Sequence, residues 1–123
     1  MTGDQLLALA DEAAKAAYAP YSNYLVGCAL LLKDGRVVTG CNVENAAYPL
    51  GVCAERTAIS KAASDGVRPG DIEAAAINAS PCGGCRQWLH EWKVERVWFR
   101  REDGSIADYA PAGALLPDTW NLP

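Results

Sequence analysis

The chain of 123 residues has 50% apolar and 21% charged residues, as in an ordinary globular protein, so we expect one domain covering residues 1–123. Its 15 acidic and 11 basic residues give a net charge of −4, which argues against a nucleic-acid-binding protein that relies on a basic surface. Five cysteines against one histidine exclude complete disulfide pairing, and any metal site with several protein ligands must use thiolates.

The apolar pattern and the turn residues predict regular elements in the order α-β-β-α-β-α-β-β. From residue 36 onward strands and helices alternate, which indicates parallel crossovers and an α/β fold. The expected ranges are a helix over 3–18, strands over 25–33 and 36–43, a helix over 53–65, a strand over 72–78, a helix over 81–92, and strands over 94–100 and 105–109.

Local signals set several of these boundaries. Thr2 and Gln5 resemble a capping box at the start of the first helix. Asp34 and Gly35 are typical of a hairpin turn between the first two strands. Pro81 is favoured in the first turn of a helix, and we expect the third helix to start near it.

Three cysteines lie at two predicted helix starts. Cys53 opens the second helix, and Cys82 and Cys85 open the third. In parallel crossover units these starts lie at the same edge of the sheet, where open α/β sheets usually bind their ligands. Residues three apart on a helix share a face, and a helix N-terminus favours the thiolate form that binds zinc. Three protein ligands leave tetrahedral zinc one open position, as in catalytic sites, and Glu55 is placed to move protons beside the ion.

The spacing alone leaves other interpretations open. Cys28 or Cys41 could supply a fourth ligand to a structural zinc site in an interaction module that is not an enzyme. Both fall in predicted strands, however, where a buried free cysteine usually behaves as a small apolar residue. A dithiol redox site is a further alternative, but it would leave Cys53 and Glu55 without a role.

The first ten residues lack the basic stretch and apolar run of a secretory signal. No stretch approaches the roughly 18–20 apolar residues of a membrane span. We therefore expect a cytoplasmic protein with no membrane partner, in which cysteine clusters are metal or catalytic sites before they are disulfides.

Several short motifs occur in order between residues 19 and 117. They read APYSNY (19–24), VG (26–27), TGCNVENA (39–46), YPLG (48–51), CAERTA (53–58), SPCGGCRQ (80–87) and LLP (115–117). In this combination they resemble the small homotetrameric zinc-dependent cytidine deaminases. The resemblance implies a three-layer α-β-α fold with a mixed five-stranded sheet, a nucleoside substrate and a homotetramer.

The resemblance also implies the reaction, which is hydrolytic deamination of cytidine and deoxycytidine to uridine and deoxyuridine plus ammonia, in pyrimidine salvage. Zinc would be held by Cys53, Cys82 and Cys85. Zinc-bound hydroxide would attack C4 of the base, and Glu55 would move protons to the ring nitrogen and the leaving amine.

Substrate contacts are likewise implied by the resemblance. Asn42 and Glu44 match the pair that binds ribose, and Ala54 would offer its backbone to the base. Tyr24 stands where the family usually has Phe against the base. Tyr48 matches a residue that the family supplies at subunit contacts near the site.

Charge suggests a role for Arg56. Three thiolates and Zn²⁺ sum to −1, and a guanidinium that donates to the sulfurs would offset this charge. We expect Arg56 to tune the metal in this way, positioned by Gln87.

Some features depart from the family pattern. Tyr24 adds a hydroxyl group against the base, and Trp120 stands near where many relatives have Phe. The segment between Ile77 and Ser80 is shorter than usual, which would change the pocket rim or a subunit contact. A deaminase of another aminated heterocycle or of a nucleoside analogue such as blasticidin S is therefore the alternative enzyme.

Overall fold

The computed structural model describes residues 1–122 and confirms the predicted order of elements. The helices are α1 (Gly3–Ala14), α2 (Ala54–Ser64) and α3 (Gly83–Glu91), with short 3₁₀ turns at Tyr48–Leu50 and Ala112–Leu115. The strands are β1 (Gly27–Leu32), β2 (Val37–Cys41), β3 (Ile72–Ile77), β4 (Arg96–Arg100) and β5 (Ile106–Tyr109).

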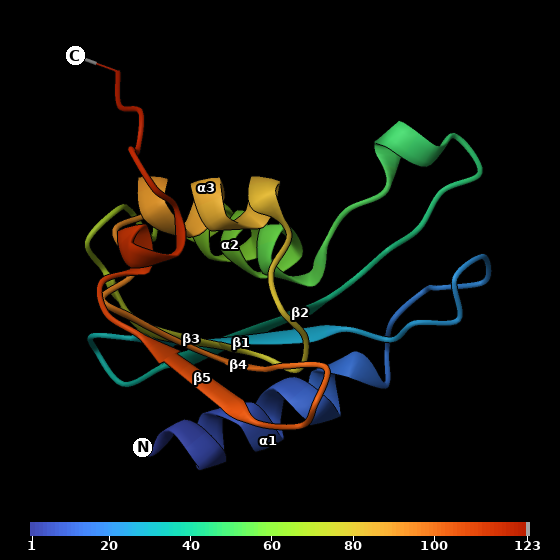
Figure 1. The fold of residues 1–123 in the computed structure, drawn as a ribbon, viewed down its shortest axis with the longest axis horizontal. Coiled ribbons are helices and arrows are strands. Elements are labelled where there is room, and N and C mark those ends of the chain that lie inside the picture. The colour runs from blue at the N-terminus through green and yellow to red at the C-terminus, as the bar shows by residue number, and fades with distance from the viewer. Residues whose placement is uncertain (123) are drawn as a thin grey trace.

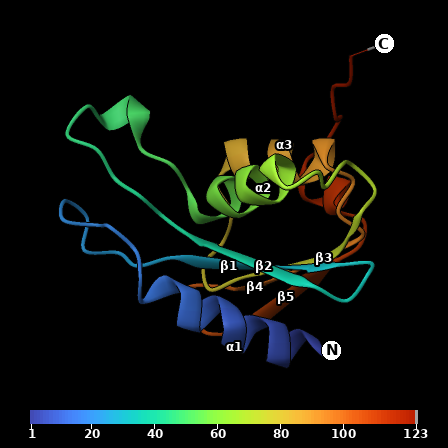
Figure 2. The same ribbon diagram turned by 180° about the vertical axis from the view of Figure 1, so that it is seen from behind.

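The strands form one mixed sheet in the order β2-β1-β3-β4-β5. β3 and β4 are parallel, and the other neighbouring pairs are antiparallel. Helix α1 covers one face of the sheet, whereas α2 and α3 lie side by side on the other (Figures 1 and 2). This is the expected three-layer α-β-α architecture.

The interior strand β1 is buried on both faces because helices cover both. Its side chains alternate between two clusters. Cys28 and Leu30 belong to the larger core under α2 and α3, whereas Ala29 and Leu31 belong to the smaller core against α1. Free Cys28 is thus a packing residue, as its strand position predicted.

Two glycines allow the helices to approach the sheet. A Cβ at position 27 would lie 1.9 Å from the carbonyl oxygen of Ala10 in α1. A Cβ at position 40 would lie 2.5 Å from the backbone nitrogen of Ala58 in α2. The two helices therefore rest on the backbone of β1 and β2 at these points.

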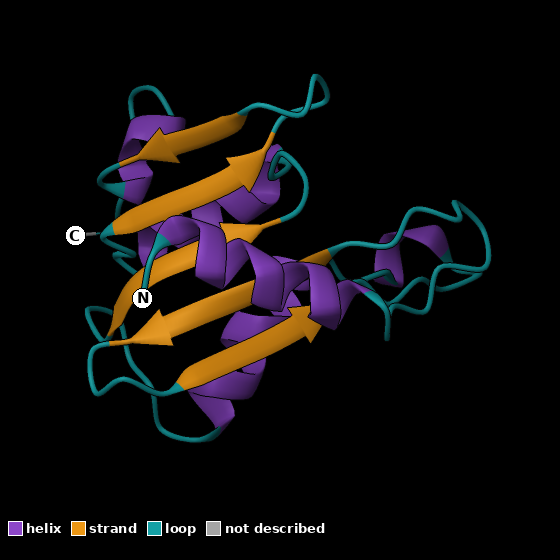
Figure 3. Ribbon diagram, turned by 90° about the horizontal axis from the view of Figure 1, so that it is seen from below, coloured by secondary structure: helices purple, strands orange, loops and turns teal. Residues whose placement is uncertain are grey.

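Two loops project together beyond one end of the sheet (Figure 3). We call them the projecting arm and define it as residues 18–25 and 43–52. Isolated bridges join Tyr18 to Val43 and Val43 to Val52. The backbone nitrogen of Tyr18 donates to the carbonyl oxygen of Asn42 at 3.0 Å. The two loops therefore form one paired unit.

The predicted end of the first helix was wrong. It ends at Ala14, four residues short of the predicted end at 18, because the chain must extend for the backbone of Tyr18 to pair with residues 42 and 44. The capping box of Thr2 and Gln5 is confirmed at its start.

The third helix also begins later than predicted. Cys82 is its N-cap, with extended backbone, and Pro81 lies outside the helix. The predicted strand over 25–33 is shorter as well, since β1 begins only at Gly27 and Lys33 is part of the turn. In residues 1–122, no helix has the length and apolar character that crossing a membrane would require.

Candidate active site

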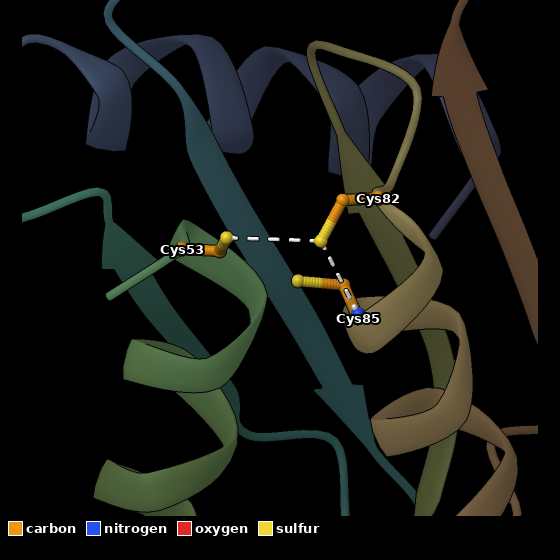
Figure 4. Close-up of side chains that lie close together, drawn as sticks. All are labelled: Cys53, Cys82 and Cys85. Atoms are coloured by element: carbon orange, nitrogen blue, oxygen red, sulfur yellow. Dashed lines mark hydrogen bonds between the residues drawn. The ribbon is translucent and has the colours of Figure 1, made fainter. Parts of the chain in front are cut away.

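Three cysteine side chains meet where α2 and α3 begin (Figure 4). Cys53 is the N-cap of α2, Cys82 is the N-cap of α3, and Cys85 lies in the first turn of α3. Their sulfur atoms all lie within 4.8 Å of one another, and those of Cys53 and Cys82 are 3.9 Å apart. Among the described residues, no fourth cysteine, histidine or carboxylate joins this group.

The thiol geometry fits a tetrahedral zinc ion. Zinc–sulfur bonds of about 2.3 Å place two sulfurs about 3.8 Å apart, close to the observed separation of Cys53 and Cys82. The helix starts also favour thiolates, and the backbone nitrogen of Cys85 lies 3.4 Å from the Cys82 Sγ. The Cys85 thiol, as a proton donor, and then Arg56 lower the pKa of Cys53 to about 5.

Glu55 points into the protein beside this cluster. It is only 3% exposed, and burial raises its pKa to about 7. The negative charge of Cys53 contributes to this rise. The pKa of the nearby Cys28 thiol is raised, mainly by its own burial and in addition by the charge of Glu55. A carboxyl group in this environment can hold and release a proton near neutral pH.

A pocket of about 530 Å³ opens over the cluster, within the range of roughly 300–1,000 Å³ typical of small-molecule sites. It brings together the expected residues Tyr24, Asn42, Cys53, Ala54 and Glu55. Its other lining residues are Val26, Asn78, Ala79, Ser80, Cys82, Arg100, Arg101, Glu102 and Gly104.

Sequence reasoning missed two parts of this lining. Asn78 follows β3 directly at the edge where the helix starts meet, and this position was a usable signal. The turn between β4 and β5, with Arg101 and Glu102, carried no such signal in the sequence because it is distant from every motif.

The structure places Glu44 in a second pocket of about 340 Å³ that shares Asn42 and Cys53 with the first. The carboxylate of Glu44 accepts hydrogen bonds from the backbone nitrogens of Tyr21 and Ser22 and from the Ser22 hydroxyl. The Ser22 hydroxyl in particular lowers the pKa of Glu44. Glu44 therefore already holds the two loops of the projecting arm together.

Tyr48 also lines the second pocket and is 89% exposed at the tip of the arm. Tyr24 is 58% exposed at the rim of the first pocket. Trp120 is exposed too and lines neither of these two pockets.

Arg56 contacts the cysteine cluster directly. Its Nη2 donates to the Cys53 Sγ at 3.3 Å, and this contact raises the pKa of the guanidinium. Its Nε is buried without a hydrogen-bond partner in the described structure. Within residues 1–122 there is no hydrogen bond between Arg56 and Gln87, the residue that was expected to position it.

Another motif residue, Arg86, holds the segment before Cys82 in place through three hydrogen bonds. It donates to the carbonyl oxygen of Pro81 at 3.0 Å, to the Ser80 hydroxyl at 3.2 Å and to the carbonyl oxygen of Leu115 at 3.2 Å. The motifs around residues 80 and 115 are thus joined in space, which fixes the approach to Cys82.

Comparisons with known proteins agree with this chemistry. The family described as "Cytidine and deoxycytidylate deaminase zinc-binding region" matches residues 2–101. The chain is 48% identical to the cytidine deaminase of Sporosarcina psychrophila, over 98% of this chain and 93% of that protein. It is also 48% identical to that of Halalkalibacterium halodurans, over 98% and 95%.

A solved structure matches the fold over the same extent. The crystal structure of cytidine deaminase from Burkholderia pseudomallei superimposes with a TM-score of 0.90 and 43% identity, over 98% of this chain and 100% of that one. The alignment with the S. psychrophila protein spans 129 positions, more than the 123 residues of this chain. That relative therefore carries residues that this chain lacks.

Proposed function

The chain belongs to the cytidine and deoxycytidylate deaminase family, and on this premise we propose that it hydrolyses cytidine and deoxycytidine to uridine and deoxyuridine, releasing ammonia. The observation that carries this proposal is the meeting of three thiol ligands with a buried carboxyl group in one pocket. A site for structural zinc alone has no use for a proton-holding group such as Glu55, which argues against an interaction module.

Cys53, Cys82 and Cys85 are the zinc ligands in this proposal. Zinc held by these thiolates would supply Lewis-acid chemistry, which makes water a nucleophile at neutral pH. The reaction adds water at C4 of the base and breaks the bond from C4 to the amino nitrogen. Arg56 donates to Cys53 and offsets the excess negative charge of three thiolates.

Glu55 carries the protons in this reaction. Its carboxylate accepts the proton that the attacking water gives up and delivers a proton to the ring nitrogen N3. It then takes the proton from the hydroxyl now bonded to C4 and transfers it to the amino group, which leaves as ammonia while C4 keeps its oxygen as a carbonyl. Burial supports this role because it raises the pKa of Glu55 to about 7, where the group can both accept and donate.

Asn42, Glu44, Tyr24 and Ala54 bind the nucleoside in this proposal. One N–H of the Asn42 amide donates to the carbonyl oxygen of Tyr24, and its second N–H is available to a sugar hydroxyl. Glu44 lines the second pocket together with Asn42, which lines both pockets. The backbone of Ala54 faces the base from the start of α2, and Tyr24 covers the base at the rim.

We further propose that the protein is a cytoplasmic homotetramer that serves pyrimidine salvage. The projecting arm supports self-association, because its apolar side chains, with Tyr48 at the tip, are exposed in one chain. Thiolate ligands support a reducing compartment, where they do not form disulfides.

One observation favours a second substrate class. The short segment after β3 leaves Asn78, Ala79 and the turn residues Arg101 and Glu102 around the pocket. These groups would face a substituent larger than an unmodified base, so a deaminase of a modified nucleoside is the alternative function.

An ammonia-release assay on zinc-loaded protein separates the two. We expect turnover of cytidine and deoxycytidine, with little activity on CMP or guanine. Activity confined to another aminated heterocycle or to a nucleoside analogue would overturn the main proposal.

X-ray absorption by the zinc-loaded protein tests the ligand set. It should show three sulfur neighbours and one lighter neighbour at zinc, whereas four sulfurs would indicate a structural site.

A further inference from the structure

Two asparagines hold the chain that leads into β1 from opposite sides. Asn42 immediately follows β2, and Asn78 immediately follows β3. Both strands are neighbours of β1 in the sheet. Each asparagine therefore stands at the next ladder position, opposite the segment of residues 24–27.

Asn42 grips this segment at Tyr24 and Val26. Its Oδ1 accepts from the backbone nitrogen of Val26 at 2.9 Å, and its Nδ2 donates to the carbonyl oxygen of Tyr24 at 2.9 Å. Its own backbone nitrogen donates to the carbonyl oxygen of Val26 at 3.1 Å. The side-chain amide thus replaces the backbone groups that a longer β2 would offer.

Asn78 repeats the arrangement from the other side. Its Oδ1 accepts from the backbone nitrogen of Gly27 at 2.9 Å, and its Nδ2 donates to the carbonyl oxygen of Leu25 at 3.2 Å. Its backbone nitrogen donates to the carbonyl oxygen of Gly27 at 3.3 Å. Successive residues of the segment are therefore held alternately by Asn42 and Asn78.

The held segment forms one wall of the pocket. Tyr24 and Val26 line it, as do Asn42 and Asn78 themselves. Outside regular strand structure, these side-chain hydrogen bonds fix where the wall lies. Losing the Asn78 side chain would leave only its backbone hydrogen bond to Gly27 on this side of the segment, and the wall would shift relative to Glu55 and the thiols.

We propose that Asn78 is a positioning residue for substrate binding, which acts through the backbone of residues 25 and 27 to place Tyr24 and Val26 against the nucleoside. This inference rests on the proposed function, since it assigns Tyr24 and Val26 to the substrate wall. It separates binding from chemistry, because Asn78 does not touch Glu55 or the cysteines in the described hydrogen bonds.

The test compares steady-state kinetics of the zinc-loaded wild type and Asn78→Ala with cytidine. We expect KM to rise roughly two- to tenfold, the effect of losing hydrogen bonds of ordinary strength, with kcat within about twofold. Zinc content should stay the same. Should Asn78→Ala not fold, Asn78→Asp keeps the acceptor for Gly27 and loses the donor to Leu25, so it should still raise KM.

A double-mutant cycle with Tyr24→Ala identifies the route of the effect. Once the Tyr24 side chain is absent, the Asn78 change should raise KM by less than it does in the wild type, because the two act through one wall. The control Asp34→Ala removes a similar side-chain hydrogen bond, to the Arg36 backbone, in the turn at the opposite end of β1. It should leave KM unchanged.

Each outcome decides the inference. Wild-type KM in a folded Asn78→Ala protein, or a fall in kcat and thermal stability alone, would overturn it, as would full additivity with Tyr24→Ala. A wild-type protein without cytidine turnover would instead refute the proposed function, before any variant is compared.

Discussion

At the start of α2 the usual order of acidity is inverted between two residues that are nearly adjacent. The pKa of the Cys53 thiol falls to about 5, because the Cys85 thiol and Arg56 donate to it. Burial raises the pKa of the Glu55 carboxyl to about 7. One group is thus ready to bind a cation as a thiolate, while the other is able to carry a proton.

Replacing the Glu55 carboxyl by an amide tests its role as the proton carrier. Glu55→Gln has nearly the same shape but cannot accept and return a proton, so kcat for cytidine should fall roughly 10²–10⁴-fold. Zinc content by atomic absorption should be unchanged, because the three thiols remain. Full activity with zinc present would refute the role.

Removing the guanidinium of Arg56 tests its effect on the metal. Arg56→Gln takes away the hydrogen bond to the Cys53 Sγ and the positive charge beside three thiolates. We expect apparent zinc affinity at neutral pH to fall roughly 10–100-fold, measured by competition with a chelator. The matched change Arg36→Gln, in the hairpin turn, should leave it unaltered; equal affinity in both variants would contradict the role.

The site residues differ in how far the sequence could predict them. Cys53, Cys82 and Cys85 were predictable because helix starts after neighbouring strands meet at one sheet edge, and the structure confirms that their sulfurs do meet. Asn78 was predictable as a pocket residue from its place after β3, but its hydrogen bonds were not, because its partners are backbone atoms of residues 25 and 27, which leave no trace in side-chain patterns. The proposed roles of the substrate contacts stay predictions.

Among the elements, the close contact of α1 with β1 gives a sharp prediction. Gly27→Ala would place a Cβ 1.9 Å from the carbonyl oxygen of Ala10 and 2.5 Å from the backbone nitrogen of Ala14. Neither backbone group can move without displacing α1, so we expect a loss of more than about 2 kcal/mol in the free energy of unfolding. Urea denaturation of the zinc-loaded protein measures it.

Gly83→Ala is the matched control for this change. Position 83 is the first residue of α3, and a Cβ there meets nothing within 4 Å. The free energy of unfolding should stay within about 0.5 kcal/mol of the wild type. Comparable losses in both variants would show that the contact between α1 and β1 is not what Gly27 permits.

Element order and type were predictable, whereas element ends were less so. Apolar periodicity and turn residues located every helix and strand, because these patterns reflect burial against a neighbouring layer. The first helix was predicted too long since Ala16 and Ala17 suit a helix locally, and only the long-range pairing of Tyr18 with the second loop ends it earlier. Tertiary pairing of this kind outweighs a helix propensity of a few tenths of a kcal/mol per residue.

At the scale of the whole molecule, the projecting arm carries apolar side chains that do not pack into either core cluster of the chain. Its apolar side chains Tyr48 and Leu50 are 89% and 67% exposed. The arm extends away from the helices and the sheet (Figure 1). Grouped exposed apolar side chains usually mark an interaction surface, which supports the proposed self-association.

A charge at the tip of the arm should weaken that association. In Leu50→Glu, a carboxylate would be buried without a partner when copies meet, so we expect light scattering after size exclusion to show a smaller species than the wild type. The folded chain should survive, because Leu50 contributes to neither buried core cluster.

Leu9→Glu introduces the same charge at an exposed position on α1, outside the arm, and should leave the mass unchanged. The wild-type mass in Leu50→Glu, or an equal shift in Leu9→Glu, would separate the arm from assembly. Since Tyr48 lies beside Leu50 and lines the pocket that shares Asn42 and Cys53 with the catalytic one, dissociation should also raise KM for cytidine.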